Sequence, residues 1–154
     1  MFAHRFRHAL MRCEGHGFYM KKLTIQKWTN SNGISGLRIQ FNERAEPVFV
    51  ARHHWIGVDF DGTLARNDIL GPSDPPYPLG EPILEMVEIV KALAAAGVRI
   101  KIFTARGGEA QNIPVIQDWT EKCGLGRLEV TDRKDFNLVC FFDDRAIPTK
   151  CMAL

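Results

Sequence analysis

Residues 57–64 read Gly-Val-Asp-Phe-Asp-Gly-Thr-Leu, and they place two carboxylates, Asp59 and Asp61, at the end of an apolar run. Side chains two apart in a strand point to the same face, and Gly62 lets the backbone turn sharply just beyond them. Two acids this close repel and raise one pKa unless a cation neutralises them. Because oxygen-only ligands suit magnesium, the stretch predicts a site for Mg²⁺ and a phosphate.

From Trp55 onward, apolar strand patterns alternate with helical ones, which predicts an α/β fold with a parallel sheet. The predicted strands are 55–60, 98–103, 128–130 and 138–142, and the predicted helices are 81–96 and 110–122. Polar residues follow the three strongest strands, at 59–61, 104–106 and 143–145. Because the ends of parallel strands share one edge of a sheet, these residues should lie close together, where ligands bind.

Four short motifs in this order resemble the haloacid dehalogenase superfamily of aspartate-nucleophile phosphohydrolases, over residues 55 to about 147. They are Asp59-Phe60-Asp61-Gly62-Thr63, Thr104 after a strand, Lys134, and Asp143-Asp144. The resemblance implies a Rossmann-like three-layer sheet. Neither residues 65–80 nor the span from 104 to 134 has room for a cap domain, so the chain is similar to the small uncapped members.

The resemblance also implies how the carboxylates divide the chemistry of phosphoryl transfer. Asp59 would be the nucleophile that forms an aspartyl-phosphate, and Asp61 would act as general acid and then base. Magnesium would be bound by the Asp59 side chain, the Asp61 backbone carbonyl and Asp143, with Asp144 as helper. Whether Asp143 or Asp144 is the direct ligand stays open.

Further residues of these motifs are expected to bind the phosphoryl group. The Thr104 hydroxyl and the Lys134 ammonium would contact its oxygens, together with backbone amides of Gly62 and Thr63. Arg106 and Arg145 are alternatives with two roles, either a fork for a substrate phosphate or a structural counter-charge. Thr104 could instead be a helix N-cap, and Lys134 lies in a charged run, 132–135, that would ordinarily be a solvated loop.

The charge is distributed unevenly, which divides the chain into a basic part at 1–52 and a phosphohydrolase domain at 53–154. Residues 1–52 hold nine Lys/Arg and three Asp/Glu, giving +6, and the remainder holds eleven and fifteen, giving −4. The basic part is predicted to contain a hairpin at about 37–51, preceded by a disordered stretch at 1–20. Met20 also fits a natural start, as an alternative to Met1.

Two interpretations of the basic part remain. It could be a nucleic-acid footprint in which aromatic side chains stack on bases, the candidates being Phe18, Tyr19, Trp28 and Phe41. It could also be a solvated tail with a hairpin that covers a sheet edge. The second interpretation is favoured, because charged tails are usually solvated.

The sequence therefore predicts a magnesium-dependent phosphomonoester hydrolase of unassigned substrate and oligomeric state. The Asp-Asp-Arg ending resembles the 3′-phosphatase part of polynucleotide kinase-phosphatases, so the substrate could be a small molecule or a nucleic-acid end. A non-catalytic module that binds phosphate and magnesium is a third alternative. Four widely spaced cysteines favour a reducing, cytoplasmic setting, and no apolar run approaches a membrane span.

Overall fold

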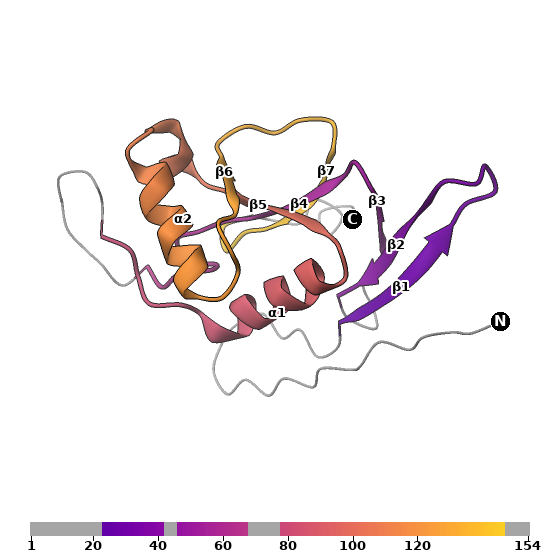
Figure 1. Cartoon of the computed structure of the whole chain (residues 1–154), viewed down its shortest axis with the longest axis horizontal. Coiled ribbons are helices and arrows are strands. Elements are labelled where there is room, and N and C mark those ends of the chain that lie inside the picture. Colours follow the sequence, from indigo (N-terminus) through magenta and orange to yellow (C-terminus); the bar gives the residue numbers. More distant parts are fainter. Residues whose placement is uncertain (1–22, 42–45, 68–77, 147–154) are drawn as a thin grey trace, which may run out of the picture.

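The computed structural model describes residues 23–41, 46–67 and 78–146, and its centre is a parallel sheet of four strands (Figure 1). The strand order is β6-β5-β4-β7, and the bounds are β4 Trp55–Val58, β5 Arg99–Phe103, β6 Glu129–Thr131 and β7 Leu138–Phe142. The predicted parallel α/β fold is confirmed. β7 has the predicted bounds, and the other strands differ from prediction by one or two residues at an end.

Helices α1 (Leu84–Ala95) and α2 (Asn112–Lys122) connect successive strands of this sheet. In α1 the side chains of Val87, Val90 and Leu93 are buried, with the spacing of one helix face. The chain leaves the helix through Gly97 at φ +86°, a conformation that suits glycine. Both connections run in the same direction across the sheet, so right-handed crossovers put both helices on one face.

The two faces of the parallel sheet are covered differently. One face contributes side chains such as Ile56, Val58 and Ile102 to the core, where they meet residues of both helices. Over the other face run residues 132–137, which connect β6 to β7, and the buried Trp55 ring donates its Nε1 hydrogen bond to Asp135 there (2.8 Å). Among the described residues no helix packs on this second face, so the predicted three-layer arrangement is not found in them.

An antiparallel sheet precedes the parallel one, in the order β1-β2-β3, with bounds β1 Thr24–Thr29, β2 Ser35–Gln40 and β3 Val48–Ala51. The pairing of β2 with β3 confirms the predicted hairpin. Ile39 and Val50 lie in the same hydrophobic core as the helices, and the Phe41 ring packs edge-on against Phe142 at 5.0 Å. The sheet is thus fixed beside β7. The disorder predicted for 1–20 lies outside the described residues.

Two further findings concern the placement of the site and the membrane. β4 is central and pairs in parallel with β7, in a register that sets Val58 opposite Phe142. Each of these residues is followed by an aspartate, so the register brings Asp59 next to Asp143. In the part of the chain that the structure describes, no helix has the length and apolar character needed to cross a membrane.

Candidate functional site

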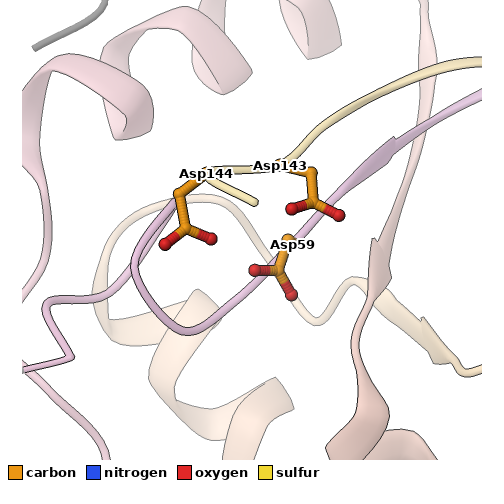
Figure 2. Close-up of side chains that lie close together, drawn as sticks. All are labelled: Asp59, Asp143 and Asp144. Atoms are coloured by element: carbon orange, nitrogen blue, oxygen red, sulfur yellow. The ribbon is translucent and has the colours of Figure 1, made fainter. Parts of the chain in front are cut away.

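Three carboxylates converge at the carboxyl ends of β4 and β7. Asp59 follows β4, and Asp143 and Asp144 follow β7. Each offers one oxygen, and these oxygens lie within 4.8 Å of one another (Figure 2). All three donors are carboxylate oxygens, the ligand type that Mg²⁺ prefers. The sequence prediction that these acids meet at one sheet edge is borne out for this trio.

Backbone and hydroxyl contacts hold the two strand ends together. The Asp59 amide donates to the Phe142 carbonyl (2.9 Å), which continues the β4–β7 ladder. The Thr63 hydroxyl oxygen accepts a hydrogen bond from the Asp144 amide (3.0 Å), and Thr63 is a buried residue. Asp143 is fixed in turn because its carboxylate accepts from the Arg145 amide (2.7 Å). The turn after β4 therefore positions the acids that follow β7.

The Asp59 carboxyl is partly buried and stands among other carboxylates. The pKa of Asp59 is raised to about 6 from the ordinary 3.8, chiefly by partial burial and also by the neighbouring carboxylates Asp143, Asp144 and Asp61. A hydrogen bond from the Phe60 amide acts in the opposite direction. Ionising Asp59 beside other carboxylates costs free energy. A bound cation offsets this cost, because it attracts all of the negative charges.

Asp61 does not join the cluster, although it was predicted to face the same ligand as Asp59. Its carboxylate forms a bidentate ion pair with Arg106, with Nε–Oδ2 at 2.6 Å and Nη2–Oδ1 at 2.7 Å. Both side chains are mostly buried, at 21% and 16% exposure. Such forks are among the strongest side-chain hydrogen bonds. In this structure Arg106 acts as the counter-charge of Asp61, the second of its two predicted roles.

Thr104 and Pro78 also contact Arg106. The Thr104 hydroxyl accepts from the Arg106 amide (3.3 Å) and caps the short helix η1 (Ala105–Gly108). Thr104 is thus an N-cap, which was the alternative interpretation of this residue. In this hydrogen bond the hydroxyl oxygen is the acceptor, so the hydroxyl proton can still be donated to another group. The Arg106 guanidinium also donates to the Pro78 carbonyl (3.4 Å). These contacts fix Arg106 at the edge of the site.

Lys134 lies over the same sheet face as Asp59. Its ammonium stands 4.6 Å from the centre of the Phe141 ring and 5.5 Å from that of Phe103. These two rings flank Gly57, where a Cβ would meet both side chains at 3.1–3.2 Å. Gly57 and Asp59 share one face of β4 because they are two residues apart. The two rings were not predicted as part of the site; a glycine within an apolar strand was the available signal.

The remaining predicted phosphate ligands are Gly62, Thr63 and Arg145, and the structure differs from expectation at Gly62. The Gly62 amide donates to the Ala65 carbonyl (2.8 Å), so this bond occupies the donor that was predicted to bind phosphate. Thr63 contributes a hydroxyl that holds Asp144, a role the sequence did not reveal. Arg145 is 73% exposed and lies 4.0 Å from the Asp144 carboxylate, which is the limit of an ion pair.

A substitution at Gly62 should damage the acid cluster specifically. A Cβ there would lie 2.4 Å from an Asp144 carboxylate oxygen, and φ is +87°. We expect Gly62→Ala to lower the free energy of unfolding by about 1–3 kcal/mol and to weaken Mg²⁺ binding at least about tenfold. Gly97→Ala is the matched control, with φ +86° and no atom within 4 Å of the new Cβ. Thermal unfolding with and without Mg²⁺ checks this, and equal loss of Mg²⁺ affinity in both variants would contradict it.

Comparisons with known proteins add no relative. No family model matches this chain, and neither the curated proteins nor the solved structures contain a match. The interpretation of the site therefore rests on its residues and their geometry.

Proposed function

We propose that the protein is a magnesium-dependent phosphomonoester hydrolase that works through an aspartyl-phosphate on Asp59. The observation that carries the proposal is the convergence of Asp59, Asp143 and Asp144 at the ends of two paired parallel strands. Because three carboxylates within 4.8 Å repel one another strongly, the cluster is suited to a hard cation. The haloacid dehalogenase-like identity of the fold is part of the same proposal.

The donor set fits Mg²⁺, with Asp59, Asp143 and Asp144 as side-chain ligands and the Asp61 carbonyl as a further one. When bound, the cation offsets the negative charge of these carboxylates and of the phosphoryl oxygens. That charge compensation also keeps Asp59 ionised, in spite of a pKa of about 6 in the metal-free protein. An ionised Asp59 is the form that can attack phosphorus.

Two displacements complete the reaction. In the first, an Asp59 oxygen bonds to phosphorus while the bond to the substrate's ester oxygen breaks, and Asp61, which takes up a proton from solvent once it has left Arg106, gives that proton to the ester oxygen. In the second, a water oxygen bonds to phosphorus, the bond to Asp59 breaks, and the water proton passes to Asp61. The products are the alcohol and inorganic phosphate. One difficult displacement is thereby divided into two easier ones.

The ion pair between Asp61 and Arg106 sets a condition on this mechanism. Asp61 must leave the guanidinium to reach the leaving oxygen, and the mostly buried Arg106 then loses a bidentate anionic partner. A phosphoryl group presents two oxygens in the geometry that an arginine fork accepts. Substrate binding can therefore exchange the partner of Arg106 and release Asp61. Lys134 and the Thr104 hydroxyl supply further donors to the phosphoryl oxygens.

The same ion pair also favours one competing function. A module that binds magnesium and phosphate without turnover would keep Asp61 locked on Arg106, as it is here. The two functions differ in one observable, because only the enzyme would release an alcohol from a phosphomonoester. A substrate with a poor leaving group separates the two functions most clearly, because that leaving group departs only when Asp61 gives it a proton.

The test compares a nitrophenyl phosphate with a simple alkyl phosphate in the presence of Mg²⁺. We expect Asp61→Asn to slow alkyl phosphate hydrolysis by about 10²–10⁴-fold. With the nitrophenyl ester, whose leaving group needs no proton, the first step should persist and release about one nitrophenolate per enzyme in a burst. The burst is followed by stopped-flow absorbance, and the phosphorylated protein by mass spectrometry.

The control for this experiment is Arg106→Gln. If Arg106 binds the phosphoryl group, this change should raise KM for both esters by a similar factor, at least about tenfold. If the change instead affects one ester much more than the other, its effect depends on the leaving group. Arg106 would then have only the counter-charge role. Absence of magnesium-dependent turnover of either ester by the unmodified chain would overturn the enzyme and favour the binding module.

A further inference from the structure

The antiparallel sheet has two chemically different faces. One face points toward the parallel sheet and also carries Lys27, which stands opposite Leu37. Its apolar side chains contribute to the shared core: Ile25, Leu37, Ile39, Val48 and Val50. The alternate residues point outward, among them Gln26, Trp28, Arg38 and Phe49. The outward face is defined here by these four residues. The core takes no side chain from it, so the fold does not account for its aromatic rings.

The outward face combines a pair of aromatic rings with a cation. Trp28 and Phe49 lie with ring centroids 4.7 Å apart, and Phe49 is 41% exposed. Arg38 stands opposite Phe49 in the sheet register and donates to the Gln26 side chain at 3.5 Å. Flat rings, a guanidinium and an amide on a sheet surface are the groups that stack on nucleobases and contact them through hydrogen bonds.

The outward face carries positive charge, because Arg38 is the ionisable residue among the four that define it. The described residues 23–41 and 46–52 hold three cations, Lys27, Arg38 and Arg52, and one acid, Glu46. Lys27 stands opposite Leu37, so it belongs to the other face of the sheet, and with Arg52 it lines a groove of about 360 Å³ where the sheet meets the end of α1. No carboxylate lies on the outward face itself. This charge opposes pairing of the face with a second copy and favours a polyanion.

The antiparallel sheet begins beside the acid cluster. Phe41 follows directly after β2, and its ring packs on Phe142, the residue before Asp143. From there β2 runs away from the cluster for about 20 Å, at about 3.3 Å per residue. A chain molecule bound along the outward face can therefore extend toward the acids.

We propose that the outward face binds single-stranded nucleic acid, with bases on Trp28 and Phe49 and a phosphate on Arg38. This makes a phosphorylated strand end the substrate class of the acid cluster, a step that rests on the proposed function. Of the aromatic residues first considered for stacking, Trp28 lies on this face. Phe41 is instead packed in the core, and Phe18 and Tyr19 lie outside the described residues.

The test measures binding separately from turnover. The full chain carrying Asp59→Asn is titrated into a fluorescent oligothymidylate of about ten nucleotides with a 3′-phosphate, and anisotropy is followed at several salt concentrations. We expect Phe49→Ser to raise Kd about tenfold. Arg38→Gln should weaken binding and reduce its salt dependence. The matched control is Phe136→Ser, since Phe136 is fully exposed on the connection between β6 and β7 and should leave Kd unchanged.

Three results would overturn the proposal. One is no binding at low salt, and another is an equal effect of Phe49→Ser and Phe136→Ser. The third is a dimer in sedimentation that Phe49→Ser dissociates, which would assign the face to a second copy. A chain that hydrolyses aryl phosphate but does not bind the oligonucleotide refutes this inference alone. With Asp59 intact, Phe49→Ser should leave kcat/KM for aryl phosphate unchanged, which separates the two proposals.

Discussion

Asp59→Asn should abolish phosphatase activity, with kcat on a nitrophenyl phosphate reduced at least about 10³-fold. The amide cannot attack phosphorus, so the aspartyl-phosphate cannot form. The side chain keeps its size, and its backbone hydrogen bond to the Phe142 carbonyl does not involve the carboxylate. The fold should therefore survive. Steady-state hydrolysis measures the loss, and thermal unfolding checks that the variant is folded.

The control for this substitution is Asp118→Asn on α2. Asp118 is 55% exposed and pairs with Arg127, which keeps Glu121 as a second partner. An exposed ion pair contributes about 1 kcal/mol at most, so this variant should keep full activity and nearly full stability. Residual activity of Asp59→Asn above one per cent would contradict the nucleophile assignment and return the cluster to a metal-binding role alone.

Removal of Mg²⁺ by a chelator should reduce turnover at least about a hundredfold and lower the thermal midpoint at neutral pH. The three carboxylates of the cluster then face one another without a cation, which costs stability. Activity should return on addition of Mg²⁺. Hydrolysis that continues in the chelator at the same rate would exclude magnesium chemistry at this site.

The stabilisation by Mg²⁺ should also depend on pH. The pKa of Asp59 is raised to about 6 in the folded metal-free protein, chiefly by burial, above the 3.8 of the unfolded chain. Its contribution to stability is therefore full below about pH 4 and is lost as pH rises through 6. Because the cation binds the ionised carboxylate, the increase in thermal midpoint on adding Mg²⁺ should be larger at pH 7.5 than at pH 5. Asp59→Asn should remove most of this difference.

The elements of the parallel sheet could be predicted from local sequence because their signals are local. Apolar runs such as Leu138–Phe142 define a strand, and the proline and glycine residues around 81–97 limit a helix. The meeting of Asp59 with Asp143 also followed, since ends of parallel strands share an edge. What local patterns could not fix was which helix covers which face, because this depends on strand order.

The direction of individual side chains was harder to predict than their location. Asp61 was expected to face the ligand of Asp59, but Arg106, 45 residues later, captures it in a bidentate pair. The Gly62 amide was expected to be a free donor, but it closes the turn on Ala65. Both outcomes depend on partners that only the folded chain brings together. Residue spacing identifies the groups of a site better than it identifies their bonds.

The pairing of β7 with β4 has a consequence for how the molecule folds. The hydrogen bonds that tie β7 to the start of the parallel sheet, Trp55 to Asp135 and Asp144 to Thr63, span 80 and 81 residues. Contacts this distant in sequence close late, because a long loop must be ordered before they form. Two of the three acids of the cluster, Asp143 and Asp144, arrive with β7. The capacity to bind a cation should therefore appear last during refolding, after the helices have already packed.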